Sequence, residues 1–511
     1  MTDSFATISE FQPSVGARIV RGAISAFVLN VLGYGCLFLG QILIARLLTR
    51  VEYAEFTVSI SFVAIMALVA DLGMTPLFTR LFAEAEEHVL AKGEDRRGTL
   101  LGSTLALRVA LSVIVAALVL LIAPLLYPAS MIHYMAILLL ALLISSRLVI
   151  VRSVGDAVLR GRGKYYLSAV FGLIDAVVFA VLMIVATYRH FTLDQVIWIY
   201  VLCNIPGFIM LARSIAQWTR REHIVLRMEW HSMRGMLKLS VPLALGTAFL
   251  TIHTQIDNIL LYHLSTPLEV SNYGATIRLS AAMSPFPLVL AAVTAPELTR
   301  LLHRGDEARA RQLTDITLRL LLVSGAAIAL VVTALANMIV PLLLGAKYAV
   351  ASPLFIWTGW MLLPIFIGTL LMEVSIAANR AWFMTAFAGV SMGAVIVGDL
   401  LLIPSHGAIG AMASKLIAVT LGAALIVWLS RNSGHLDAGR FTSAFARTGL
   451  AAGTALGAFW MMPNNASGKL FALVVALAIY YLIVHFTHVL PIKEVTALLK
   501  RIRRPVGNTN L

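Results

Sequence analysis

Apolar runs follow one another along almost the whole chain, and each is about 20 residues long, the length that an α-helix needs to cross a bilayer. They are continuous and rich in Leu, Ala, Val and Ile, unlike the alternating ten-residue strands of a membrane β-barrel. The runs lie near 22–46, 53–78, 98–124, 131–155, 165–188, 193–217, 236–262, 270–296, 316–343, 352–378, 382–404, 407–430, 442–462 and 469–490. The pattern predicts an all-α, polytopic membrane protein with about 14 transmembrane helices.

Composition supports the bilayer as the solvent of this chain. Its 511 residues are 60% hydrophobic and 13% charged, and the mean hydropathy is +0.90. Soluble domains average about 25% charged residues. A soluble fold of this length is therefore excluded.

Two short stretches recur later in the chain at one spacing. The segment Leu47–Phe56, LLTRVEYAEF, is echoed 217 positions on by Leu264–Tyr273, LSTPLEVSNY. Lys164–Gly172 is echoed at the same spacing by Ala381–Gly389. A common spacing indicates an internal repeat, although chance recurrence in Leu- and Ala-rich sequence is the alternative. The first motif is interpreted as a structural hairpin, with Glu52 and Glu269 at the start of the second helix of each repeat.

The repeat unit holds six predicted helices, an even number, so both copies have the same membrane orientation. They are parallel repeats, as found in carriers that rock between two open states. The predicted organisation is a six-helix N-terminal half over residues 1–220 and a six-helix C-terminal half over 221–431. Residues 432–511 form two further helices and a basic cytoplasmic tail.

The basic residues predict the orientation. With a cytoplasmic N-terminus, most Lys and Arg residues fall in inside loops, as the positive-inside rule requires. The outside loops then hold only Arg46, Arg50, Arg189, Lys347 and Lys469. Both termini are expected in the cytoplasm, and this bias explains the net charge of +14 without any nucleic acid. The basic tail either fixes the topology or contacts anionic membrane lipids.

No signature of catalysis, cofactor or metal binding is present. The chain lacks HExxH and Walker motifs, and its two cysteines, Cys36 and Cys203, lie in membrane runs. A membrane-embedded polymerase would need a sizeable outside loop with acid–base residues, and the predicted outside loops are short. We therefore expect a transporter, not an enzyme, with no cofactor.

The segment Ile42–Met74 resembles the N-terminal signature of bacterial polysaccharide transporters, the lipid-linked oligosaccharide flippases of the multidrug/oligosaccharidyl-lipid/polysaccharide exporter superfamily. The usual pattern, Ala-Arg-x-Leu-Gly-Pro-x-x-Tyr-Gly-x-Phe, is matched at Ala45, Arg46, Leu48, Tyr53 and Phe56, and is not matched at Thr49, Arg50 and Ala54. Gln255–Ser265 resembles the family's seventh-helix segment. The resemblance implies two six-helix lobes plus two helices, a place in the bacterial inner membrane, and sugar chains on undecaprenyl pyrophosphate as substrate.

Ionisable residues inside membrane runs cost about 2.5–3.5 kcal/mol each on insertion scales and are functional candidates. They are Asp71, Arg108, Asp175, Asp257, Arg278, Glu373, Asp399 and Lys415. An arginine in a cavity offers paired hydrogen bonds to phosphate. Arg278 is the first candidate, with a salt bridge to Asp257 as the alternative. Arg108 is the second, with a pair to Asp175 as the alternative.

Uncharged polar residues in the same runs are suited to sugar hydroxyls, and the candidates are Asn30, Gln41, Gln255 and Asn258. Asp257 is the candidate for binding a coupling ion, either H⁺ or Na⁺, and helical spacing would let Thr254 and Asn258 add oxygens. Lys415 is expected to pair with Asp399 within the second half.

The predicted function is a flippase that carries undecaprenyl-pyrophosphate-linked oligosaccharides across the inner membrane by alternating access, for surface polysaccharide assembly. A peptidoglycan-precursor flippase and a cation-coupled multidrug exporter are the alternatives. Expected partners are the lipid-linked oligosaccharide and membrane lipids, with a polysaccharide polymerase and glycosyltransferases in the same pathway.

Overall fold

The computed structural model describes residues 15–92, 95–145, 151–283, 285–462 and 466–490. This part of the chain contains helices and no strands, which confirms the all-α prediction. The predicted basic tail after residue 490 lies outside the described residues.

The helices form two groups and a terminal pair. The first group is α1 (Val15–Leu47), α2 (Arg50–Asp71), α3 (Met74–Lys92), α4 (Arg97–Leu126), α5 (Ala129–Ile144), α6 (Arg152–Gly161), α7 (Tyr165–Arg189), α8 (Leu193–Leu202) and α9 (Ile205–Arg221). The second is α10 (Trp230–Leu264), α11 (Pro267–Ser280), η1 (Ala281–Met283), α12 (Pro285–His303), α13 (Glu307–Leu344), η2 (Ala346–Ala351), α14 (Ser352–Ala377) and α15 (Trp382–Asn432). The pair is α16 (Ala438–Trp460) and α17 (Ala466–Phe486).

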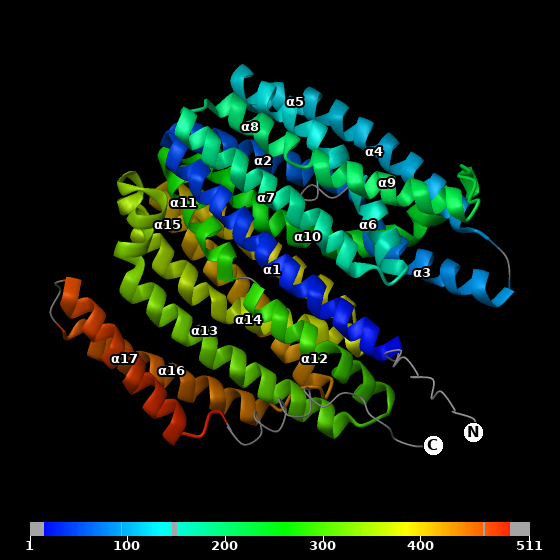
Figure 1. Ribbon diagram of the computed structural model, residues 1–511. Coiled ribbons are helices and arrows are strands. Elements are labelled where there is room, and N and C mark those ends of the chain that lie inside the picture. Colours follow the sequence, from blue (N-terminus) through cyan, green and yellow to red (C-terminus); the bar gives the residue numbers. More distant parts are fainter. Residues whose placement is uncertain (1–14, 93–94, 146–150, 284, 463–465, 491–511) are drawn as a thin grey trace, which may run out of the picture.

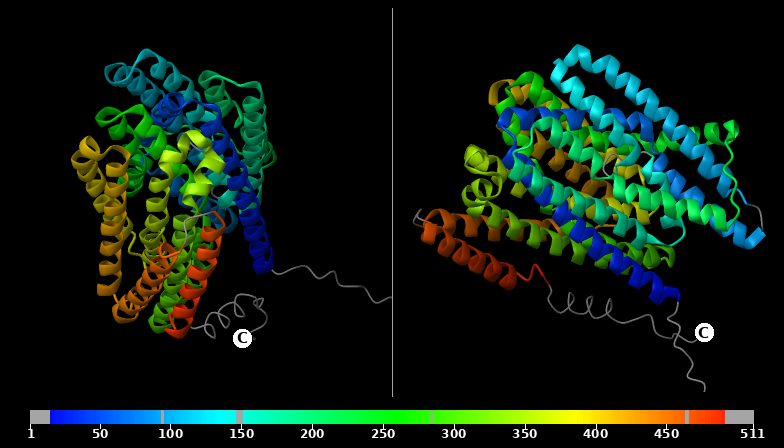
Figure 2. Two further views of the ribbon diagram at one scale, coloured as in Figure 1. Left: turned by 90° about the vertical axis from the view of Figure 1, so that its left-hand side faces the viewer. Right: turned by 45° about the horizontal axis from the view of Figure 1, so that its top comes forward.

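The two groups lie side by side. In Figure 1 most of the first group occupies the upper right, and α13, α16 and α17 occupy the lower left. The groups touch where α2 packs on α10 and α11 and where α1 packs on α11 and α13. The terminal pair packs on α13 at the edge of the second group, which is visible in both views of Figure 2.

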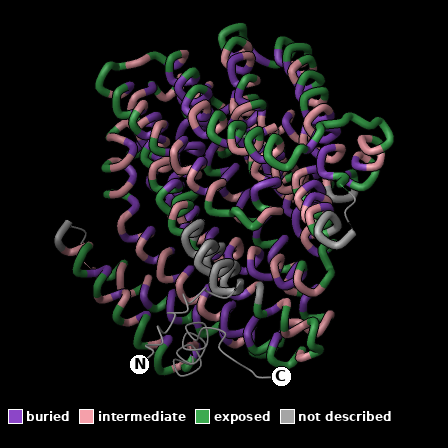
Figure 3. The backbone as a smooth tube through the Cα atoms, turned by 45° about the vertical axis from the view of Figure 1, so that its right-hand side comes forward, coloured by how far each residue is buried: buried purple, intermediate pink, exposed green. Residues whose placement is uncertain are grey.

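Large apolar side chains are exposed along the helices. Leu121 and Leu125 of α4, Leu401 of α15 and Phe486 of α17 are 69–80% exposed. Figure 3 shows exposed residues along the length of the helices, not only at their ends. Such a surface suits lipid, because an acyl chain does not penalise an apolar side chain as water does. A polytopic membrane protein is therefore confirmed.

The structure contains fewer candidate membrane spans than the sequence predicts. Among the described residues, nine helices are long and apolar enough to cross a membrane, or up to ten if α10, bent by 59° between Val241 and Ala244, counts as one span. The prediction was about fourteen. Two predicted runs fall short of a spanning length: 131–155 contains only the 16-residue helix Ala129–Ile144, and 270–296 breaks at η1.

The long helix α15 contains two of the predicted runs. Gly407 has φ 53° and ψ −131°, a conformation that favours glycine, and it interrupts the helix. Ser414 beyond this break donates a hydrogen bond to the Val395 carbonyl before it, at 3.0 Å. The chain therefore folds back at Gly407 into two arms that lie side by side, as the runs 382–404 and 407–430 predict.

The repeated motif is a helix start in both copies. Thr49 caps α2, and its backbone N–H donates to the Glu52 carboxylate at 2.8 Å, a reciprocal capping box. Thr266 caps α11 and accepts from the Glu269 N–H, while the Glu269 carboxylate accepts instead from Ala408 N at 2.9 Å, just after the α15 break. The hairpin prediction is confirmed for both motifs.

Helix ends repeat at the predicted spacing as well. The helices α1 and α10 end at Leu47 and Leu264, and α7 and α15 begin at Tyr165 and Trp382, so each pair lies 217 positions apart. These positions agree with an internal repeat. The boundaries of the two six-helix halves, at 220 and 431, stay a prediction.

Candidate functional site

The two helix groups meet through polar side chains inside the membrane region, and Arg278 of α11 is the most prominent. Its Nη1 donates to Gln41 Oε1 of α1 at 2.8 Å. Its guanidinium carbon also lies 5.3 Å and 5.1 Å from the ring centres of Tyr53 and Phe56 in α2. Such cation–π contacts are attractive. The contact thus brings together two predicted site residues, Gln41 and Arg278.

The alternative salt bridge between Arg278 and Asp257 is wrong. The Asp257 carboxylate is bonded to Lys415 at 2.5 Å, and it projects from α10 into the second helix group. No carboxylate among the described residues lies within 4.0 Å of the Arg278 guanidinium. Arg278 is therefore a half-buried cation whose partners are an amide oxygen and two aromatic rings.

A second polar contact crosses the groups between α2 and α10. Ser61 of α2 donates to Gln255 Oε1 at 2.9 Å, and Asn258 Nδ2 donates to Ser61 Oγ at 3.0 Å. Gln255 and Asn258 lie three residues apart on α10, so both reach the same hydroxyl. The structure thus places these two predicted sugar contacts at the boundary between the groups.

Asp257 lies one helical step away but faces the opposite direction. It is 1% exposed and pairs with Lys415 of the second α15 arm, whose ammonium also donates to the His253 carbonyl. The expected pair of Lys415 with Asp399 is therefore replaced by one with Asp257. Thr254 is exposed, and its hydroxyl donates to the Thr251 carbonyl at 2.9 Å, so it does not join Asp257 as expected.

Arg108 is enclosed within the first group. Its side chain is 0% exposed and donates to Asp71 at 2.8 Å and to Thr75 at 2.8 Å. The predicted pair with Asp175 is wrong, because Asp175 bonds to Arg152 and accepts from the Gly207 N–H at 2.8 Å. The break after Asp71, where Leu72 has φ 41°, ends α2 so that Asp71 and Thr75 lie together against α4.

Sequence reasoning missed Arg152, which was not among the ionisable candidates. The side chain is 2% exposed and joins α6 to α7 through Asp175. The available signal was Asp175 itself, since a carboxylate in the middle of a membrane run requires a nearby cation. Arg152 is that cation.

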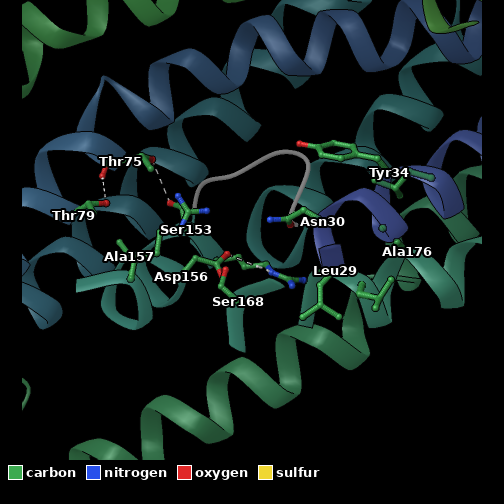
Figure 4. A pocket seen from close by; sticks show the side chains of 16 residues that line it. Leu29, Asn30, Tyr34, Thr75, Thr79, Ser153, Asp156, Ala157, Ser168 and Ala176 are labelled. Atoms are coloured by element: carbon green, nitrogen blue, oxygen red, sulfur yellow. Dashed lines mark hydrogen bonds and ion pairs between the residues drawn. The ribbon is translucent and has the colours of Figure 1, made fainter. Parts of the chain in front are cut away.

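A cavity of about 380 Å³ lies in the first group between α1, α3, α6 and α7. Figure 4 shows its polar lining, in which Ser168 donates to Asp156 at 2.6 Å and Asn30 reaches the rim from α1. Arg152 also lines it. The predicted residue Asn30 therefore belongs to this cavity and not to the Arg278 contact.

A network of charged residues connects the ends of α3, α4, α6 and α9 in the first group. Arg97 bonds to Asp95, Glu86 and Glu222, and Arg162 bonds to the same two glutamates. Hydrogen bonds from Arg97 lower the pKa of the Asp95 carboxyl, which lies outside the spans. This network fixes the ends of α3, α4, α6 and α9 and belongs to the scaffold.

A sequence model described as polysaccharide biosynthesis protein matches residues 19–302, more than half of the chain. The chain belongs to the polysaccharide biosynthesis protein family. This finding confirms the resemblance in Ile42–Met74. No curated protein matches the chain significantly.

Solved structures share the fold of this family member. The lipid II flippase MurJ in an inward closed conformation has a TM-score of 0.69 at 13% identity, covering 91% of this chain and 98% of that one. An inward-facing multidrug resistance MATE transporter of the MOP superfamily has a TM-score of 0.64 at 14% identity, covering 79% and 94%. A MOP superfamily transporter from Pyrococcus furiosus has 0.54 at 13%, covering 81% and 95%.

Proposed function

We propose that this protein is a flippase that carries undecaprenyl-pyrophosphate-linked oligosaccharides across the bacterial inner membrane by alternating access. Family membership and a fold shared with lipid-linked and multidrug carriers support this function. Both termini would face the cytoplasm, as the distribution of basic residues favours. The end where α1 turns into α2, here called the α1–α2 end, would face outward.

One observation carries the proposal: Arg278 is a membrane cation without an anionic partner. Arg108, Arg152 and Lys415 each have a carboxylate within bonding distance. Arg278 has none among the described residues, although an unpaired charge at such depth is costly. It lies eleven residues into α11, about 16 Å below the start of that helix and close to the middle of a 30 Å hydrocarbon core. A pyrophosphate would supply the missing negative charge.

The other predicted substrate-binding residues lie in different parts of the protein. Gln41, Gln255 and Asn258 lie between the helix groups, where hydroxyl groups of a sugar would compete for the same amide atoms. Asn30 lies on the rim of the cavity in the first group. Arg108 is neutralised by Asp71, so a substrate role would require that pair to open.

Two alternative functions are a peptidoglycan-precursor flippase and a cation-coupled multidrug exporter. Peptidoglycan-precursor transport is favoured by the similarity to MurJ, whose own name is lipid II flippase. Both flippase substrates would present phosphate to Arg278. A multidrug exporter for cations is disfavoured by Arg278, which has no carboxylate partner among the described residues, because its positive charge would repel the drug.

The energy source and partners are also proposals. Export would use a gradient of H⁺ or Na⁺ bound near Asp257, with Thr254 requiring a rearrangement to contribute. Glycosyltransferases would supply the substrate, and a polysaccharide polymerase would consume it outside.

The test compares Arg278→Ala, Arg278→Lys and the exposed control Arg300→Ala in cells that depend on this protein. Charge-assisted hydrogen bonds contribute about 1.5–3 kcal/mol each, so the alanine variant should bind undecaprenyl pyrophosphate roughly 10- to 100-fold more weakly. Arg278→Lys keeps a charge but loses the planar fork, so its affinity should fall between those of wild type and alanine. Arg300→Ala should be unchanged.

The readouts are surface polysaccharide, protein abundance, and binding of undecaprenyl pyrophosphate to purified protein. Since Asp257 bonds Lys415, adding Asp257→Ala to Arg278→Ala should not restore any lost abundance. Normal export and normal binding by Arg278→Ala would refute the proposal. Rescue of cells depleted of their lipid II flippase would select the peptidoglycan precursor as the substrate.

A further inference from the structure

A buried group of ionisable residues lies between α10, α11 and the two arms of α15, inside the second helix group. Asp257 is 1% exposed, Asp399 is 0% exposed and Lys415 is 6% exposed. The fold-back at Gly407 places Asp399 and Lys415 on neighbouring arms, both against α10. We refer to Asp257, Asp399 and Lys415 as the carboxyl–lysine cluster.

Several oxygen atoms in this cluster lack hydrogen-bond partners. Asp257 uses Oδ2 for Lys415, but its Oδ1 has no partner, and neither carboxyl oxygen of Asp399 has one. The buried Tyr273 hydroxyl of α11 faces both carboxyls. Buried polar atoms are almost always paired. A bound species that donates to carboxyl oxygens would satisfy this arrangement.

The charges do not balance when every group takes its ordinary form. The described ionisable groups that face Asp399 are Asp257 from α10, Tyr273 from α11, and Lys415 from its own helix, and His253 of α10 faces Lys415. Two carboxylates against one ammonium leave one negative charge in a water-poor interior. Glu373 of α14, the helix on the other side of α15, interacts with none of these groups.

Two adjacent carboxyls relieve such a surplus by sharing one proton, because like charges cannot both be sustained at short range. The Asp257 and Asp399 carboxyls are close enough to interact directly. With one shared proton the cluster is neutral: one carboxylate faces the Lys415 ammonium and the other carboxyl is an acid. That acid also gives the orphaned oxygens a donor.

We propose that the carboxyl–lysine cluster binds one proton, and that the Lys415 ammonium fills the position that a coupling Na⁺ would otherwise take. The ammonium is held by a carboxylate oxygen of Asp257 and by the His253 carbonyl, the kinds of oxygen that hold Na⁺ in carriers. This inference rests on the proposed function and names H⁺ as the coupling ion.

The cluster is connected to the contact between the helix groups through α10. Asp257 lies between Gln255 and Asn258, which both bond to Ser61 of α2. Loss of the proton leaves a net negative charge beside Lys415. The hydrogen bonds from Lys415 of α15 to Asp257 and His253 of α10 must then rearrange. The proton therefore acts on the helix that carries the polar contact to the first group.

The first experiment measures the melting temperature of the purified full-length protein in NaCl and in choline chloride at equal ionic strength. Wild type should melt at the same temperature in both, because Lys415 holds the cation position. Lys415→Ala empties that position, so Na⁺ should raise its melting temperature with concentration. If this variant does not accumulate, Lys415→Ala with Asp399→Asn carries less charge and should show the same response.

The second experiment detects the proton itself by the infrared band of a neutral carboxylic acid at pH 7. All proteins carry Glu373→Gln, which removes the other half-buried membrane carboxyl of this region. The parent should show the band. Asp399→Asn and Asp257→Asn should each lose it, because the single carboxyl left beside Lys415 is then an ion-pair partner.

Na⁺-dependent stabilisation of wild type, or none in either lysine variant, would overturn the assignment of the cation position. A band that persists in both asparagine variants would overturn the shared proton. Neither experiment uses a lipid-linked substrate. They can therefore fail while the Arg278 binding test succeeds, or succeed while that test fails.

Discussion

The contacts at the α1–α2 end lead to a quantitative prediction. Arg46, on the last turn of α1, donates from Nε to the Leu343 carbonyl of α13 at 2.7 Å and from Nη2 to that of Leu342. Lys347, just after α13, donates to the Arg46 carbonyl at 3.0 Å and to that of Leu48. Each cation thus binds carbonyls at the C-terminus of the other helix, an arrangement that we call the reciprocal clasp.

The clasp stabilises a closed α1–α2 end by a moderate amount. The last carbonyls of a helix have no partners within that helix and carry its negative dipole end, so a cation there contributes about 0.3–1 kcal/mol when exposed and up to about 2 when partly buried. Arg46 is exposed and Lys347 is half-buried. Together they should contribute about 2 kcal/mol, or roughly 30-fold in the ratio of closed to open states.

Removing both cations should therefore open this end. If the closed state begins at about 99:1, Arg46→Ala with Lys347→Ala should leave the end open in roughly a quarter of the molecules. Spin labels on cysteines at the exposed positions Val51 and Val350 would report the separation between the two groups. The native Cys36 and Cys203 are first replaced by alanine.

The control is Arg50→Ala, which removes one positive charge from the same end. Arg50 makes no hydrogen bond to the second group among the described residues. Distance distributions should be unchanged in the control and gain a longer component in the double variant. Identical distributions in all three proteins would show that the clasp does not hold this end closed.

Two further predictions concern the scaffold and the topology. Arg152→Ala leaves the buried Asp175 carboxylate without its cation and should destabilise the protein by about 3–5 kcal/mol, seen as a lower melting temperature in detergent. Adding Asp175→Asn should restore part of the lost stability. No restoration would argue against the pair. Cysteines introduced at Ser130 and Ser405 should react with impermeant reagents from outside, and one introduced at Ser433 should not. The reverse labelling pattern would overturn the predicted membrane orientation.

The all-α, polytopic membrane fold was readable from the sequence, because the length of the apolar runs indicates it directly. The runs 382–404 and 407–430 are separated only by Ser405 and His406, yet the structure folds back there because Gly407 adopts a positive φ. The motif containing Thr49 and Glu52 was likewise predictable, because capping is a local interaction between residues three apart.

The partners of buried charges were not readable, because they depend on how each helix is rotated about its axis. Arg108 could reach several carboxylates in principle, and the break after Asp71 decides the pair. Lys415 is 16 residues from Asp399 and 158 from Asp257 in sequence, yet it bonds the more distant one. Nothing in a hydropathy pattern encodes that rotation.

Some hydrogen bonds between the two helix groups could be displaced by a bound substrate and others could not. This difference suits alternating access. The reciprocal clasp uses backbone carbonyls as acceptors, which a pyrophosphate would not displace. The bond between Gln41 and Arg278 is different, because a phosphate oxygen accepts from a guanidinium more strongly than an amide oxygen does. A bound pyrophosphate would therefore take Arg278 from Gln41 and release α1 from α11. The clasp would then be left as the principal polar hold on the α1–α2 end. Opening toward the outside would depend on bound substrate without any contact between substrate and clasp.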